Sequence, residues 1–166
     1  MQLNHNFSFF VISDNIRSLE NIGSIFRTAD SFGMDKIYLG GISGMYRRGT
    51  AKFLHPKISK TALGAELNVS WEHDWQNWRI IDKLKKEGVE IVCLEQAKKA
   101  VDILKFRPKF PLALVVGNEI KGVSKAILKR ADAVVQIPML GKKESLNVAV
   151  AFGIAAFEIN KFRFFS

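Results

Sequence analysis

The chain has 166 residues, a length that fits one domain with a sizeable hydrophobic core. Hydrophobic residues make up 48% of it and charged residues 25%, which excludes an intrinsically disordered chain. The net charge of +9 favours a polyanionic partner such as RNA, DNA or an anionic membrane, although many basic domains bind none of these.

The cysteine content and the N-terminus indicate a cytoplasmic protein. Cys93 is the only cysteine, so it forms no internal disulfide, and its apolar neighbours favour a buried structural thiol over a nucleophile. No Cys/His cluster has zinc spacing, and we expect no metal. Residues 1–6 lack a signal pattern, and the longest apolar run, residues 148–157, is too short to span a membrane.

Apolar runs and amphipathic segments alternate in the first half of the chain. The pattern predicts strands over residues 7–12, 36–39 and 69–71, and helices over residues 19–32 and 75–87. Gly33 and Gly88 follow these two helices, as C-terminal caps do. Residues 42–67 are rich in glycine and basic residues, and we expect a mobile loop there with a short helix near residues 61–66.

The second half continues the alternation. It predicts strands over residues 89–94, 112–116 and 134–137 and helices over residues 124–130 and from residue 148 onward, with residues 98–109 mostly loop. Strands that alternate with helices form a parallel sheet covered on both faces. The chain is therefore predicted to be a single α/β domain over residues 1–166.

The last helix organises this prediction. Residues 148–157 carry no polar side chain, and a helix that is apolar all round is expected to be buried on every face. Ser145 and Asn147 precede this helix and suggest a functional site at its N-terminus. Both are also plausible capping residues, and Ser145 fits an N-cap well.

Three loops should meet at one edge of the sheet, because ligands bind at the carboxyl ends of parallel strands. These loops follow Leu94, Val116 and Ile137, and each is polar or contains glycine. A small-molecule site is the expectation there. Residues 117–124 match G-x-x-x-x-G-x-S, but Val123 occupies the lysine position of a phosphate-binding loop. No G-x-G-x-x-G follows a strand, so a dinucleotide fold has no support.

Single polar residues leave two interpretations open. Arg27 lies in the otherwise apolar pattern of the first helix. The plain interpretation is that its aliphatic chain packs over the core while its guanidinium is in solvent. Asn21 lies near the start of that helix. Glu119 is equally readable as an ordinary solvated loop acid.

Three ordered blocks, however, resemble the motifs of the SpoU (TrmH-type) RNA 2′-O-ribose methyltransferases of the SPOUT superfamily. The blocks are N-I-G-S-I-F-R-T-A-D from Asn21 with Phe32-Gly33, L-V-V-G-N-E from Leu114 with G-V-S from Gly122, and I-P-M from Ile137 with Gly141 and S-L-N-V from Ser145. Residues 60–66 and 94–96 also resemble family segments. The resemblance covers essentially the whole chain.

This resemblance implies a parallel sheet whose C-terminal part forms a deep trefoil knot, an exception to the rule that chains are unknotted. It implies S-adenosylmethionine as the cofactor and a homodimer built around the knot helices. By motif match, the cofactor pocket would be lined by Leu94, Gly117, Ile137, Met139 and Leu146.

The resemblance also implies catalytic roles. Arg27 matches the catalytic arginine of the family. A guanidinium is almost always protonated, so we favour Arg27 as a phosphate clamp, with the phosphate or water accepting the proton of the ribose hydroxyl. Hydrogen bonds from the remaining motif residues would shape the site: Asn21, Glu119, Ser145 and Asn147. Basic segments at residues 47–60 and 98–109 would contact RNA phosphates or form a solvated surface.

The resulting prediction is an S-adenosylmethionine-dependent RNA 2′-O-methyltransferase, acting on tRNA rather than rRNA. Because the sequence shows no additional RNA-binding domain, we expect this domain, its dimer surface or a partner protein to determine which RNA is the substrate. The alternative is a non-catalytic RNA-binding or assembly protein that retains the fold. A methyltransferase acting on a base or a protein fits the motifs less well.

Overall fold

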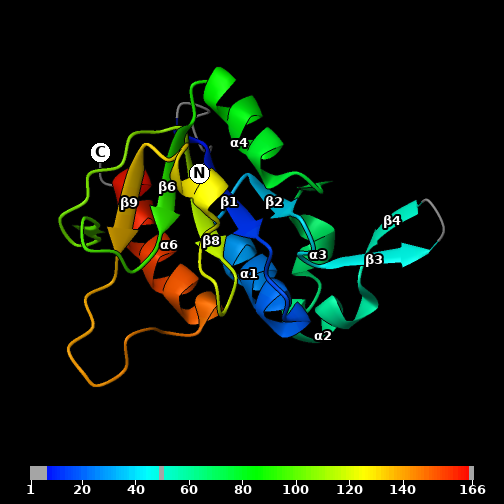
Figure 1. The fold of residues 1–166 in the computed structure, drawn as a ribbon. Helices are drawn as coiled ribbons and strands as arrows, with labels where there is room; N and C mark the ends of the chain where they lie inside the picture. Colours follow the sequence, from blue (N-terminus) through cyan, green and yellow to red (C-terminus); the bar gives the residue numbers. More distant parts are fainter. Residues whose placement is uncertain (1–6, 49–50, 165–166) are drawn as a thin grey trace.

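The fold is built on a parallel sheet of seven strands (Figure 1). The structure is a computed structural model that describes residues 7–48 and 51–164, so the predicted lack of a signal segment at residues 1–6 lies outside it. Every pairing in this sheet is parallel. The strands follow in spatial order: β5 (Trp71–Asp74), β2 (Lys36–Gly40), β1 (Phe9–Asp14), β8 (Leu112–Gly117), β6 (Glu90–Leu94), β9 (Ala133–Gln136) and β7 (Val101–Asp102).

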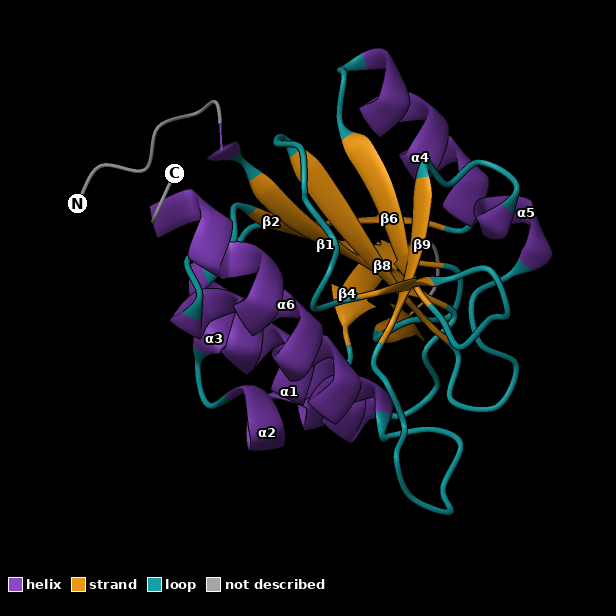
Figure 2. Ribbon diagram, turned by 90° about the vertical axis from the view of Figure 1, so that its left-hand side faces the viewer, coloured by secondary structure: helices purple, strands orange, loops and turns teal. Residues whose placement is uncertain are grey.

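Helices cover both faces of the sheet, as Figure 2 shows. One face carries α1 (Leu19–Ser31), α2 (Ser59–Ala62), α3 (Ala65–Asn68) and α6 (Val148–Phe164), with the short 3-10 helix η2 (Pro56–Ile58) before α2. The other face carries α4 (Asn77–Lys86) and α5 (Lys125–Leu128). The predicted α/β class is confirmed. Strand order does not define how the chain threads, so the trefoil knot stays a prediction.

The central strands are apolar throughout because both of their faces are buried. All residues of β8 are buried. Alternate side chains divide between two cores: Leu114 packs with the α1 and α6 layer, whereas Val115 packs with the α4 layer. Cys93 also belongs to the α4 core, and burial raises the pKa of its thiol to about 12, as expected for a structural cysteine.

Helix α1 forms where the sequence predicts it. The Ser18 hydroxyl accepts a hydrogen bond from the Asn21 N–H at the N-cap, and Ile22, Ile25 and Phe26 are buried. The helix ends at Ser31, and Gly33 follows with φ of +59°, a conformation that glycine adopts without strain. The predicted C-terminal cap is therefore confirmed.

Two elements were not predicted from the sequence. Instead of a mobile loop, β3 (Met45–Arg48) and β4 (Ala51–Leu54) form an antiparallel hairpin that extends from the body of the molecule (Figure 1). Each strand of this hairpin has only four residues, and the sequence shows no clear alternation of apolar residues there. Strand β7 has only two residues and forms the edge of the sheet beside β9, which is too short for any periodicity.

The expectation that the last helix is buried on every face is wrong for the single chain. Phe152, Ala155, Ala156 and Ile159 are buried. A stripe along the opposite side of α6 is exposed, with Val150 at 52%, Ile154 at 40% and Phe157 at 61%. These positions recur every three to four residues, so they share one helix face. The helix therefore has an apolar face that this chain does not cover.

The C-terminal end of α6 is fixed by a buried guanidinium. Arg163 donates hydrogen bonds to the carbonyl oxygens of Phe7, Phe32 and Gly33, at 2.9, 3.3 and 3.0 Å. It also lies 3.4 Å from the Asp35 carboxylate, and its side chain has no exposed area. A single cation thus connects the start of β1, the end of α1 and α6.

Replacing Arg163 with Ala should lower the free energy of unfolding by about 3 kcal/mol, because it removes a buried guanidinium that donates to three backbone carbonyl oxygens and pairs with the Asp35 carboxylate. The matched control is Lys161→Ala, which removes the half-exposed ion pair with Glu158 and should cost no more than about 0.5 kcal/mol. Urea unfolding curves of both variants measure the difference. Equal losses would contradict the connecting role of Arg163.

Candidate functional site

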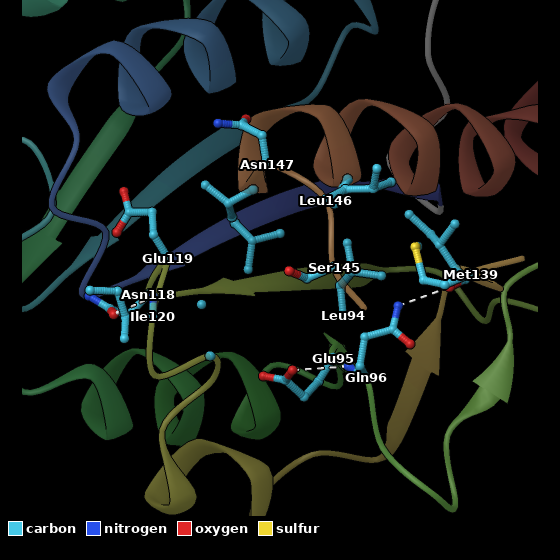
Figure 3. A pocket seen from close by; sticks show the side chains of 16 residues that line it. Leu94, Glu95, Gln96, Asn118, Glu119, Ile120, Met139, Ser145, Leu146 and Asn147 are labelled. Carbon is cyan, nitrogen blue, oxygen red and sulfur yellow. Dashed lines mark hydrogen bonds between the residues drawn. The ribbon is translucent and has the colours of Figure 1, made fainter. Parts of the chain in front are cut away.

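The carboxyl ends of the central strands meet at one edge of the sheet. The register places Gly117 opposite Asp14 and Leu94 opposite Val116, while Val135 lies opposite Leu94. A cavity of about 250 Å³ opens at this edge, between the loops that follow β6, β8 and β9 and the start of α6 (Figure 3). Its position is the one that the sequence predicts.

Most of the predicted site residues surround this cavity. All five predicted cofactor contacts line it: Leu94, Gly117, Ile137, Met139 and Leu146. Three of the five predicted catalytic residues line it as well: Glu119, Ser145 and Asn147. Glu119 and Asn147 lie on one side of the cavity, and Met139 lies on the other (Figure 3).

Asn21 joins the cavity through hydrogen bonds. Its Nδ2 donates to Glu119 Oε1 at 3.1 Å, and its Oδ1 accepts from Asn147 Nδ2 at 3.1 Å. These three residues come from α1, the loop after β8 and the residue before α6. The hydrogen bonds fix the orientation of both amides, with each group acting as the donor or acceptor that its partner needs.

Arg27 is the predicted catalytic residue that this structure does not bring to the cavity. It is exposed on α1, and it does not line the cavity. It lies six positions after Asn21, which corresponds to about 9 Å along the helix axis and a rotation of about 120°. Arg27 therefore faces the outer side of the helix layer, away from the Asn21–Glu119–Asn147 network.

The Glu119 carboxylate accepts several hydrogen bonds at the start of α1. The backbone N–H groups of Ser18 and Arg17 donate to it at 2.9 and 3.1 Å, in addition to Asn21. Partial burial raises the pKa of Glu119, but these hydrogen bonds outweigh burial and the net pKa is lowered. Glu119 is thus a charged acceptor at neutral pH that receives three hydrogen bonds, although the residue itself is exposed.

Two further carboxylates hold the loop between Gly117 and Ser124. Asp14 is buried at the end of β1, and its Oδ2 accepts from the Ser124 N–H at 2.6 Å. Glu95 Oε2 accepts from the Val123 N–H at 2.7 Å. Within the loop, Asn118 Oδ1 accepts from the N–H groups of Ile120 and Lys121, both at 3.0 Å. The cavity wall is therefore fixed at several points.

The start of α6 differs in detail from the expectation. Asn147 is the capping residue, because its Oδ1 accepts from the N–H of Ala149 at 2.9 Å and from that of Val150 at 3.3 Å. Ser145 lies two residues earlier in the loop and is not the N-cap. Asn147 thus has two functions: its Oδ1 caps the helix and its Nδ2 binds Asn21.

Sequence reasoning gave no role to two polar side chains that shape the cavity. Gln96 Nε2 donates to the carbonyl of Ile137 at 2.9 Å and connects the loops after β6 and β9. Glu95 fixes the loop after β8, as described above. The available signal was their position, since two polar residues directly follow the apolar run that ends at Leu94.

The charges around the cavity are of one sign. Its lining contains two carboxylates, Glu95 and Glu119, and no lysine or arginine. The other walls are mainly apolar, from residues such as Leu94, Ile137 and Met139. Such a cavity fits a ligand with an apolar ring and a positive charge. Within residues 7–48 and 51–164, no group of three or more His, Cys, Asp or Glu side chains could hold a metal ion.

The two basic segments lie outside this cavity. Among the described side chains of the first segment, Lys57 and Lys60 are exposed, whereas those of Arg47, Arg48 and Lys52 lie outside the described part. The second segment is exposed at Lys98, Lys99 and Lys105. No helix in the described part of the chain is long and apolar enough to cross a membrane.

Comparison with known proteins identifies the family. Residues 8–157 match the SpoU rRNA Methylase family. A putative TrmH family tRNA/rRNA methyltransferase of Bacillus subtilis is 31% identical over 155 residues, covering 93% of this chain and 59% of that protein. The tRNA (guanosine(18)-2′-O)-methyltransferase of Aquifex aeolicus is 31% identical over 163 residues, covering 92% of this chain and 69% of the relative.

The fold is shared with solved methyltransferases. The AdoMet-bound crystal structure of an rRNA methyltransferase from Sinorhizobium meliloti superposes with a TM-score of 0.81 at 26% identity, covering 100% of this chain and 60% of the other. The sheet, the helices and the family match together define an α/β domain of SPOUT type. The chain belongs to the SpoU (TrmH-type) methylase family. It spans 59% of the length of the Bacillus subtilis relative.

Gly117 tests the geometry of the cavity wall. A Cβ at this position would lie 2.3 Å from Gly122 C and Val123 N, both backbone atoms that cannot easily move. Gly117→Ala should therefore destabilise the protein by about 2 kcal/mol. Gly141→Ala is the matched control, because no atom lies within 4 Å of its added Cβ. Thermal unfolding measures both, and an unchanged transition in Gly117→Ala would contradict the close packing of this loop.

Proposed function

We propose that this protein transfers a methyl group from S-adenosylmethionine to a ribose 2′-hydroxyl of RNA. The observation that carries the proposal is the cavity at the strand ends, with two carboxylates and no cation in its lining. S-adenosylmethionine has a positive sulfonium and a net positive charge, whereas the product left after methyl transfer is neutral. A negatively charged cavity therefore favours binding of the methyl donor and release of the product.

The residues of the cavity fit the shape of this cofactor. Leu94, Ile137 and Leu146 provide apolar contacts for an adenine ring, and Gly117 and Gly122 keep backbone groups close to the ligand. When bound, the cofactor supplies an electrophilic methyl group on sulfur. The relatives named above support this assignment, since one is described as a tRNA 2′-O-methyltransferase and another as an AdoMet-bound rRNA methyltransferase.

The polar network then positions the ribose. The Asn21, Glu119 and Asn147 side chains are held by mutual hydrogen bonds, so they present fixed donors and acceptors beside the cavity. Ser145 adds a hydroxyl to the same wall. Holding the attacking oxygen in line with the methyl group lowers the barrier through proximity and orientation. The proton of the 2′-hydroxyl passes to an RNA phosphate or to water, because no histidine lines the cavity and its two carboxylates, Glu95 and Glu119, accept hydrogen bonds from backbone N–H groups.

We propose that the active form is a homodimer built on the helix layer of α1 and α6. Helix α6 lies beside α1 (Figure 2), and its exposed stripe from Val150 to Phe157 is apolar. The stripe favours association with an apolar surface, and a second copy presents the same stripe. Arg27 is exposed on the same layer. In such a dimer Arg27 acts at the cavity of the other subunit, where it clamps an RNA phosphate.

Substrate preference and location complete the proposal. We propose tRNA as the substrate, which the Aquifex relative acts on, with rRNA as the other candidate. The enzyme works in the cytoplasm as one domain over residues 1–166. The competing proposal, a non-catalytic RNA-binding protein, lacks a reason for the Asn21–Glu119–Asn147 network beside a cavity suited to a cation.

Incubation with methyl-labelled S-adenosylmethionine and bulk tRNA or rRNA should place label in 2′-O-methylnucleosides. Nucleoside analysis by mass spectrometry identifies the product and separates ribose from base methylation. Labelled bases or labelled protein would overturn the ribose assignment. Tight cofactor binding with no product on either RNA would support the non-catalytic alternative.

Mixing two inactive variants tests the role of Arg27 across the dimer. Arg27→Ala and Glu119→Gln should each abolish turnover, with cofactor affinity nearly unchanged in Arg27→Ala. After subunit exchange the mixture should regain roughly a quarter of wild-type activity, because half of the dimers are mixed and each has one complete site. No recovery in a mixture shown to exchange subunits would place Arg27 in its own subunit's site or outside catalysis.

A further inference from the structure

A second, larger cavity lies beside the first. It has a volume of about 610 Å³ and is lined by residues from the end of β1, the turn after β2 and the loop between β8 and α5. Three of its lining residues, Asn118, Ile120 and Gly122, also line the first cavity. The loop from Asn118 to Gly122 is therefore the common wall of two neighbouring cavities.

The charges of the second cavity are the reverse of the first. Arg17, Lys121 and Lys125 line it, and no carboxylate does. All three cations are exposed, and none forms an ion pair within the described part of the chain. In contrast, Lys36, Lys83 and Arg130 elsewhere on the surface are paired with acids. The cavity thus presents uncompensated positive charge.

The two nearby acids, Asp14 and Glu119, lie outside the lining of this cavity. The Asp14 carboxylate is buried and accepts hydrogen bonds from the Ser124 N–H, Asn15 and Asn77. The Glu119 carboxylate is directed at the backbone N–H groups of Arg17 and Ser18. Both carboxylates are therefore occupied by hydrogen-bond donors of the protein.

Apolar surface accompanies the cations. Ile42 and Ile120 line the second cavity and are exposed, at 52% and 82%. The Asn15 side chain adds an amide. Anionic groups joined to flat, largely apolar rings would match this combination, and a nucleotide of an RNA strand has both parts.

We propose that the second cavity binds a nucleotide of the substrate RNA next to the one that is methylated. Its phosphate lies among Arg17, Lys121 and Lys125, and its base packs against Ile42 and Ile120. This inference rests on the proposed function for its choice of RNA. The fixed wall between the cavities then holds the polyanion on one side and the cationic methyl donor on the other, which sets the strand beside the cofactor.

The wall itself is suited to this role. Asn118 Nδ2 donates to the carbonyl of Asn15 at 2.8 Å, and the backbones of Asn118 and Gly122 exchange two hydrogen bonds. The Asn118 side chain and backbone are thus engaged within the protein. A nucleotide bound on the basic side would be held at a fixed distance from the first cavity, which contributes to orientation of the ribose.

The test is the affinity of the full chain for bulk tRNA, measured by filter binding at several salt concentrations, in Lys121→Ala/Lys125→Ala. The matched control is Lys86→Ala/Lys129→Ala, which removes two exposed lysines without ion pairs at sites outside either cavity. We expect the first variant to bind RNA at least tenfold more weakly, with a slope of log K against log salt reduced by about 1.5. The control should change affinity by less than threefold.

Two further measurements separate the possible outcomes. The Lys121→Arg/Lys125→Arg variant should restore affinity because it keeps both charges, and its unfolding temperature shows whether the loop is intact. Cofactor binding without RNA, measured by calorimetry, should be unchanged in all variants. Equal loss of RNA affinity in the control would overturn the proposal, since net charge alone would explain it. Tight binding of inorganic phosphate to the wild-type protein, with RNA affinity unchanged in Lys121→Ala/Lys125→Ala, would also overturn it.

The outcome of this test is distinct from that of the proposed methyl transfer. If the wild-type protein binds no S-adenosylmethionine, the proposed function fails, whereas a selective loss of RNA affinity in Lys121→Ala/Lys125→Ala would still assign the second cavity to RNA. If methyl transfer occurs and the variant binds RNA normally, the enzyme assignment stands and the second cavity is not an RNA subsite.

Discussion

The site depends on one recurring interaction, in which a carboxylate accepts hydrogen bonds from backbone N–H groups of a distant segment. Asp14 holds Ser124, Glu95 holds Val123, and Glu119 holds the start of α1 at Arg17 and Ser18. Hydrogen bonds to an ionised acceptor are short and roughly twice as strong as neutral ones. Together they fix the loop after β8 against β1, β6 and α1. The loop can therefore serve as a wall between two cavities of opposite charge.

The opposite charges of the two cavities follow from where the acids and bases lie on either side of this loop. Glu95 and Glu119 contribute to the side that faces α6, whereas Lys121 and Lys125 contribute to the side that faces the turn after β2. Attraction and repulsion between charges become stronger where water is partly excluded. In the proposed arrangement, the charge of one cavity disfavours a cationic cofactor and the charge of the other disfavours a polyanion. This separation would orient both reactants of the proposed methyl transfer.

The sequence predicted the parts of the fold that depend on apolar periodicity. The central strands, α1 with Gly33, and the cavity at the ends of β6, β8 and β9 follow from buried runs and from the geometry of parallel sheets. The hairpin of β3 and β4, the two-residue β7 and the cap by Asn147 carry no such periodicity. Arg27 was assigned from a motif, but its direction depends on helix phase, which places it on the outer face of α1.

Helix α6 shows how a wrong expectation can still be informative. Its residues from Val148 to Phe157 are too apolar for one chain, which covers Phe152, Ala155 and Ala156 but leaves Val150 and Phe157 open. Contiguous exposed apolar surface on a folded chain indicates a binding surface. In the proposed homodimer, a second copy would cover these exposed apolar residues. Since Arg27 shares the exposed layer, the same contact that completes the burial of α6 would bring a cation to the neighbouring site.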